Sequence, residues 1–107
     1  MGAEPADDPV LTRFRAALEH AYAGRIARIV LFGSRARGDA GPESDYDVGL
    51  FLTDLRSFDQ EAQVLAEIET DLLTAIGAVV NTLPLPADAY DARTAWMREM
   101  RRDGVPL

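Results

Sequence analysis

Two short apolar runs separated by a polar segment constrain the fold of this chain more than any other feature. Residues 26–32, IARIVLF, are rich in β-branched and aromatic side chains and stop at Gly33, and residues 45–52 read DYDVGLFL. Runs of this length and composition are typical of β-strands. Between them, SRAR can form one helical turn that Gly38 ends, and the Gly, Pro, Asp and Ser that follow indicate an exposed loop. We therefore expect two strands joined by a turn and a loop.

Helical periodicity appears on both sides of these strands. Apolar side chains recur at steps of three and four in two segments, at Leu11, Phe14, Leu18 and Tyr22 and again at Leu65, Ile68, Leu72 and Ile76. Each set shares one face of a helix. We expect the first helix over 9–23, with Asp8 as its N-cap and Gly24 as its C-cap. We expect the second over 58–76, after a capping box that begins at Ser57.

The C-terminal third continues this alternation of strand and helix. Residues 78–85, AVVNTLPL, predict a third strand, which Pro84 and Pro86 restrict to a sheet edge or a strand end. A last helix is expected to begin at Asp88, as its N-cap, and to end at Gly104. The expected order is αβ, turn, βαβα.

Size and composition limit the chain to one ordinary domain. Its 107 residues are 48 % hydrophobic and 27 % charged, which is typical of a globular protein, and we place the domain at 9–107 after a flexible tail at 1–8. The net charge of −7 disfavours non-specific nucleic-acid binding, which requires many contacts from Lys and Arg to phosphate. No segment approaches the roughly 20 apolar residues of a membrane span, and no export signal or cysteine is present. We expect a cytoplasmic protein without membrane binding.

Asp45 and Asp47 are the first candidates for a functional site. Carboxylates at positions i and i+2 of a strand point to the same face, so they can hold one or two hard cations between them. Mg²⁺ prefers oxygen ligands and is commonly held by one or two carboxylates together with substrate phosphates. Tyr46, between them, points to the other face and is expected in the core.

Gly33 and Ser34 supply a complementary feature. Gly33 allows a sharp turn and a close approach of the backbone to a ligand, and Ser34 opens a helical turn whose free N–H groups favour an anion. Arg35 and Arg37 flank this turn and offer bidentate contacts to a triphosphate, although solvated loop charges are the competing interpretation. A metal site beside an anion site is the arrangement that phosphoryl transfer requires.

The combined motif resembles the signature of the DNA polymerase β nucleotidyltransferase superfamily. Gly33-Ser34, ten intervening residues and Asp45-Tyr46-Asp47 are similar to that signature, and GSRARGDAGPESDYDVGLF looks like its small stand-alone branch, the minimal nucleotidyltransferases. The resemblance implies an α/β (α+β) fold with a small mixed β-sheet of three to four strands packed against three or four helices. It also implies Mg²⁺ at Asp45 and Asp47, nucleotide phosphates at Gly33 and Ser34, and a basic contact from Arg37.

The resemblance further implies an activity and a partner. Members of this branch transfer a nucleoside monophosphate and release pyrophosphate, which here predicts AMP transfer from ATP. Their usual partner is a small helical HEPN toxin, which the nucleotidyltransferase neutralises by binding it or by adding AMP to one of its tyrosines. Such a chain would form a homo- or hetero-oligomer.

One position departs from the family pattern. Active members place a third carboxylate on a later strand, and the aligned position here is Asn81. An amide oxygen can ligate a metal, but it carries no charge and cannot act as a base. Asp54, Asp88 and Asp91 are alternative third ligands, although Asp88 and Asp91 are equally explained as helix-start residues.

Three interpretations of function follow. The first is an Mg²⁺-dependent nucleotidyltransferase, and the second is a binding module of the same fold with little catalysis, which Asn81 favours. An aspartyl phosphatase is disfavoured because its Asp-x-Asp should end a strand, not open one. His20, the one histidine, is expected on a helix surface away from the motif. Trp96, Met97 and Met100 form an apolar stripe that belongs either to the core or to a partner surface.

Overall fold

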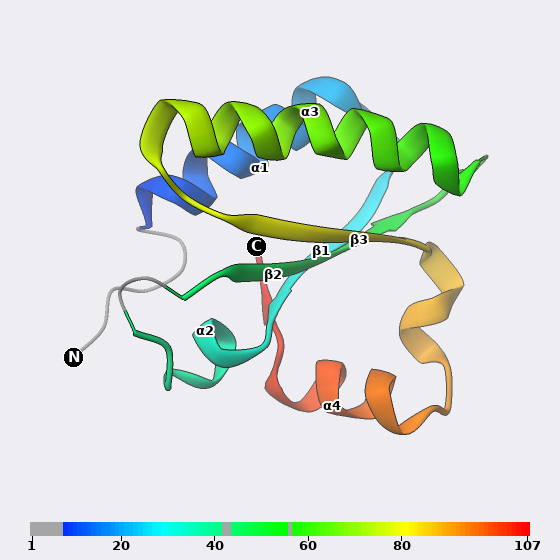
Figure 1. Ribbon diagram of the computed structural model, residues 1–107. Helices are drawn as coiled ribbons and strands as arrows, with labels where there is room; N and C mark the ends of the chain where they lie inside the picture. Colours follow the sequence, from blue (N-terminus) through cyan, green and yellow to red (C-terminus); the bar gives the residue numbers. More distant parts are fainter. Residues whose placement is uncertain (1–7, 42–43, 56) are drawn as a thin grey trace.

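The structure is a computed structural model that describes residues 8–41, 44–55 and 57–107 (Figure 1). Its elements are α1 (Pro9–Ala21), β1 (Ile26–Phe32), α2 (Ser34–Arg37), β2 (Tyr46–Leu52), α3 (Phe58–Ile76), β3 (Val80–Pro86), the 3₁₀ helix η2 (Ala87–Asp91), α4 (Ala95–Asp103) and β4 (Val105–Pro106). Residues 1–7 of the expected tail lie outside the described residues. None of the helices in the described ranges is long and apolar enough to cross a bilayer.

The four strands form one mixed sheet in the order β3-β2-β1-β4. β1 is antiparallel to both β2 and β4, whereas β2 and β3 are parallel. Parallel neighbours need a long crossover connection, and α3 provides it. The expected α+β fold with a small mixed sheet and several helices is therefore confirmed. The parallel register places Asp47 directly beside Asn81.

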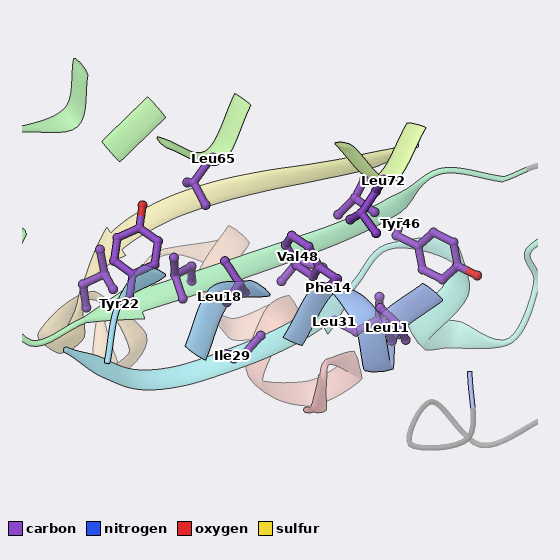
Figure 2. Packing of buried hydrophobic residues seen from close by; sticks show 13 residues of the cluster. Leu11, Phe14, Leu18, Tyr22, Ile29, Leu31, Tyr46, Val48, Leu65 and Leu72 are labelled. Atoms are coloured by element: carbon purple, nitrogen blue, oxygen red, sulfur yellow. The ribbon is translucent and has the colours of Figure 1, made fainter. Parts of the chain in front are cut away.

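Helices α1 and α3 cover one face of the sheet, and α2, η2 and α4 lie on the other (Figure 1). The main core lies under α1 and α3, where side chains from both helices meet those of β1 and β2 (Figure 2). The predicted apolar face of α1 is confirmed, because all four of its members are buried. A smaller core on the opposite face contains Val30, Phe51, Met97 and Met100.

Several predicted boundaries agree with the structure. β1, α2 and α3 have the expected limits, and the Ser57 side chain accepts a hydrogen bond from the Gln60 N–H at the start of α3. α1 begins as expected, with Asp8 accepting from the Val10 N–H at 2.8 Å. It ends two residues early because Tyr22 leaves helical geometry at φ −122° to bury its ring. Ile76, expected on the inward face of α3, is 43 % exposed.

The start of the last helix was predicted wrongly. Asp88 lies inside η2, and the N-cap of α4 is Thr94, whose hydroxyl accepts from the Met97 N–H at 3.2 Å. Ala92 is extended, with ψ 144°, so η2 and α4 are separate helices joined by non-helical backbone. The expected sheet had three to four strands, but no strand was predicted at Val105–Pro106, because two residues carry no periodic pattern. It pairs Leu31 with Val105 and adds a fourth strand to the sheet.

Candidate active site

Asp45, Asp47 and Asn81 meet where β2 and β3 run side by side. Asp45 immediately precedes β2 and is exposed, Asp47 is partly buried, and Asn81 is exposed on β3. The Asn81 Nδ2 amide donates to Asp45 Oδ2 at 3.2 Å and to Asp47 Oδ1 at 3.4 Å. The parallel register thus brings Asn81 beside Asp45 and Asp47, which lie more than thirty residues earlier in the sequence.

The chemistry of this donor set fits a hard cation. The positive end of the Asn81 amide lies against both carboxylates, which is the location where a cation would be stabilised. Rotation of the amide by a half-turn would present its oxygen there instead. Two carboxylates and a neutral oxygen, with the remaining positions left to water and phosphate, match the preferences of Mg²⁺.

No third acidic side chain joins the pair in the part of the chain that the structure describes. There, no group of three or more His, Cys, Asp and Glu residues could hold a metal ion. Asp54, Asp88 and Asp91, the alternative third ligands, therefore lie outside the cluster. Asn81 is the neighbour that accompanies Asp45 and Asp47.

Gly33 touches the same cluster from the end of β1. It has φ 76° and ψ −157°, a region that is almost restricted to glycine. A Cβ atom at this position would lie 2.5 Å from Asp47 Oδ2, which is a steric clash. Ser34 then opens the single turn of α2, so the backbone passes directly beside Asp47 before it turns away. A larger residue at position 33 would displace the carboxylate.

The two candidate phosphate-binding arginines occupy different environments. The Arg35 guanidinium lies 3.8 Å above the Tyr46 ring, and its Nε donates to the Ser44 carbonyl at 2.9 Å. Tyr46 leaves β2 on the face opposite Asp47. Arg37 is exposed, pairs with Asp39 at 3.4 Å, and lines a hollow together with Gly33. Arg37 is thus the arginine on the Gly33 side.

Tyr46 anchors the start of β2, between the two aspartates. It is 6 % exposed, as expected for a core residue, and its hydroxyl donates to Asp8 Oδ2 at 2.7 Å. Burial, followed by the hydrogen bond to Asp8, raises the pKa of Tyr46 to about 12. His20 is exposed on α1, as predicted, and it lies outside this cluster.

Two residues beside the cluster, Glu99 and Asp103, were not identified as functional from the sequence, and Trp96 was considered only as part of the core or of a partner surface. Trp96, Glu99 and Asp103 line the same hollow as Gly33, which has a volume of about 180 Å³. Their spacing of three and four is that of one helix face, so a helical reading of 95–103 could have grouped them. Of the stripe left open between core and surface, Met97 and Met100 are buried, whereas Trp96 is 42 % exposed.

Comparisons with known proteins identify the family of this chain. The family model described as polymerase beta, nucleotidyltransferase, matches residues 18–85. A protein of Methanocaldococcus jannaschii that carries the name of a protein adenylyltransferase is 34 % identical over 90 residues, which cover 84 % of each chain.

Solved structures share the fold. One, described as a toxin–antitoxin with AMP-PNP, aligns at a TM-score of 0.63 and 19 % identity over 89 % of this chain and 69 % of that chain. Another, described as a minimal nucleotidyltransferase, aligns at a TM-score of 0.59 and 23 % identity over 90 % of each chain. The family match covers more than half of the sequence and includes Gly33, Asp45, Asp47 and Asn81. The chain therefore belongs to the polymerase β nucleotidyltransferase family of enzymes.

Proposed function

We propose that this protein is an Mg²⁺-dependent adenylyltransferase that moves AMP from ATP to a hydroxyl group of a partner protein. The acceptor we propose is a tyrosine of a HEPN toxin, so that the chain acts as an antitoxin. The observation that carries this proposal is the convergence of Asp45, Asp47 and Asn81 beside Gly33. Two carboxylates next to a close backbone approach suit a metal-bound triphosphate.

Each residue of the cluster has a distinct role in this proposal. Asp45 and Asp47 hold one or two Mg²⁺ ions, and Gly33 and Ser34 present the backbone to the phosphates. When bound, Mg²⁺ supplies charge neutralisation to the triphosphate. Arg37 is the better placed of the two arginines for a phosphate contact, because Arg35 is engaged by Tyr46 and Ser44.

Asn81 limits the rate of such a reaction. The acceptor oxygen bonds to the α-phosphorus, the bond to pyrophosphate breaks, and the acceptor proton must leave. The Asn81 amide cannot take that proton. A tyrosine acceptor, whose phenol has an ordinary pKa of about 10, would lose its proton to solvent more readily as the pH rises.

The choice of AMP and of a protein acceptor draws on the comparisons. The relative named as a protein adenylyltransferase aligns over most of both chains. The toxin–antitoxin structure with AMP-PNP contains an ATP analogue, and it has the same fold as this chain. These names favour ATP as the substrate and a toxin as the partner.

The test is transfer of label from ATP, marked at its α-phosphate, to a purified HEPN toxin. With Mg²⁺ present, we expect label on a toxin tyrosine, and we expect Asp45→Asn and Asp47→Asn to abolish it. Asp71→Asn, an exposed carboxylate on α3, is the matched control and should transfer label normally. Transfer that survives both substitutions would contradict the site assignment.

A second candidate function is neutralisation by binding alone. Asn81 favours it, because the third carboxylate of active family members is replaced by a neutral side chain. The same experiment separates the two functions. If no label moves, and the toxin remains neutralised by wild-type, Asp45→Asn and Asp47→Asn proteins alike, the chain acts as a binding module.

A further inference from the structure

A hollow lies beside Gly33, and its lining residues do not include Asp45, Asp47 or Asn81. Its lining residues come from α2, from α4 and from the end of β1 with Gly33. Helices α2 and α4 lie on the same face of the sheet (Figure 1). Gly33 forms part of the wall of the hollow and is also the residue in contact range of Asp47. A volume of about 180 Å³ is well below that of a pocket for a complete drug-sized ligand. The hollow can therefore accept one ring of a substrate whose phosphates lie at Gly33.

Trp96 gives this hollow an aromatic surface. Trp96 is 42 % exposed, although the next residue, Met97, is buried in the core. Phe32, which immediately precedes Gly33, holds the Trp96 ring edge to face, with the ring centroids 6.0 Å apart and the planes at 90°. This contact fixes the indole at the edge of the hollow. An exposed indole held in this way suits stacking with a planar aromatic group.

The charges around the hollow indicate which kind of ring it accepts. Glu99 and Asp103 contribute two carboxylates, and Arg37 contributes one guanidinium. Hydrogen bonding to Arg102 holds the pKa of Asp103 below its usual range, so this carboxylate stays ionised at neutral pH. Arg102 donates to both carboxylate oxygens of Asp103 at 3.0 Å. A carboxylate oxygen has two lone pairs, so Asp103 and Glu99 can still accept hydrogen bonds from an amino group. Adenine and cytosine carry an exocyclic amino group, whereas uracil presents a carbonyl at the equivalent position.

We infer that Trp96, Glu99 and Asp103 form a subsite for an amino-bearing nucleobase of the nucleotide substrate. Trp96 stacks on the base, and the carboxylates accept from its amino group. This inference rests on the proposed nucleotidyltransferase function, because it requires a triphosphate at Gly33. It assigns nucleotide selectivity to one face of α4.

Trp96 is the one tryptophan of the chain, so its fluorescence reports directly on the hollow. The full-length protein is titrated in Mg²⁺ with ATP, CTP, UTP and inorganic tripolyphosphate, and binding is measured in parallel by calorimetry. We expect ATP and CTP to quench Trp96 with the same midpoint as the heat signal. UTP and tripolyphosphate should bind with heat but leave the fluorescence nearly unchanged.

Substitutions separate stacking from general structural effects. Trp96→Ala should weaken ATP binding by roughly 5- to 100-fold, as expected for the loss of one base stack, and should leave tripolyphosphate binding unchanged. Trp96→Phe should restore most of the affinity. Phe58→Ala, which removes an exposed aromatic ring from α3, is the matched control and should bind ATP normally. Glu99→Gln should reduce the preference for ATP over UTP, whereas Glu67→Gln on α3 should not.

The outcomes distinguish this inference from the function on which it rests. Heat on ATP addition without any change in Trp96 fluorescence would overturn the base subsite while leaving nucleotide binding intact. Equal quenching by tripolyphosphate and ATP would overturn it too, because the hollow would then respond to phosphate. Absence of both signals with every nucleotide would contradict the inference and the proposed function together.

Discussion

Asn81 places a neutral amide where the carboxylates of Asp45 and Asp47 converge. This amide determines how strongly the two carboxylates repel each other and how strongly the cluster can bind a cation. Its N–H groups lie between Asp45 and Asp47 and so reduce the repulsion between them. A carboxylate at this position would give stronger metal binding at the cost of a third negative charge.

Asn81→Asp tests this balance. Without metal, we expect the added charge to lower the free energy of unfolding by about 1 kcal/mol, because the three carboxylates are partly solvated. With Mg²⁺, we expect tighter metal binding and transfer faster by about 100-fold, since a carboxylate can accept the acceptor proton. Denaturant unfolding with and without Mg²⁺, combined with label transfer, measures both effects. A variant with unchanged stability and rate would show that residue 81 is remote from the metal.

Gly33→Ala tests the close contact with Asp47. Gly38 provides a matched control, because it also has positive φ, at 82°, but a Cβ there would meet nothing within 4 Å. We expect Gly38→Ala to lower the free energy of unfolding by about 1 kcal/mol and Gly33→Ala by about 2–3 kcal/mol. Gly33→Ala alone should also weaken binding of Mg²⁺ with ATP in calorimetry. Equal effects of the two substitutions would contradict the role of Gly33.

The sequence was sufficient for part of this cluster. The i, i+2 spacing of Asp45 and Asp47 predicts a shared face from strand geometry alone. The neighbour at Asn81 depends on the pairing of two strands that are separated by α3, and local periodicity contains no information on that register. Its place came from the family resemblance, and the parallel ladder shows the contact directly.

At the scale of elements, α4 links the small core to the hollow. Met97 and Met100 bury one side of the helix, and Trp96, Glu99 and Asp103 line the hollow from another. Strand β1 and helix α3 were predictable, because the apolar pattern of each element and the residues that mark its ends predict the same limits. The start of α4 was not predictable from the sequence. Asp88 shortly after Pro86 has the pattern of a helix start, but the chain forms only a 3₁₀ helix there.

Thr94→Ala tests the observed start of α4. Loss of the hydroxyl that accepts from the Met97 N–H should lower the free energy of unfolding by about 1 kcal/mol. Asp88→Ala should have a smaller effect, since its side chain caps no α-helix. Denaturant unfolding of both variants measures the difference. A larger loss from Asp88→Ala would contradict the capping that the structure shows.

In the whole molecule, one face of the sheet contains the main hydrophobic core and the other contains the candidate active site. The face under α1 and α3 holds the main core, including Tyr22 and Tyr46 (Figure 2). The opposite face, with Gly33 and α4, carries the hollow. Tyr46 connects the main core to the candidate active site, because its side chain belongs to the core and its chain neighbours are Asp45 and Asp47.

The two buried tyrosines predict how stability depends on pH. Burial is the main cause that raises the pKa of Tyr22 and of Tyr46 from 10.0 to about 12. A group whose pKa is raised on folding contributes stability that is present below its unfolded pKa and is lost as the pH rises toward the folded value. We therefore expect the free energy of unfolding to fall between about pH 10 and pH 12. Tyr46→Phe should reduce that fall, and an unchanged alkaline profile in this variant would contradict the assignment.

We propose that Asp45 and Asp47 bind the metal of a nucleotide substrate, and calorimetric titration with ATP, with and without Mg²⁺, is the most direct test of this role. The wild-type protein should bind ATP at one site in a manner that requires Mg²⁺. Asp45→Asn and Asp47→Asn should each weaken that binding by about 10- to 100-fold, while Asp71→Asn should not. Binding of equal affinity in the wild-type protein and in both site variants would show that Asp45 and Asp47 do not hold the metal.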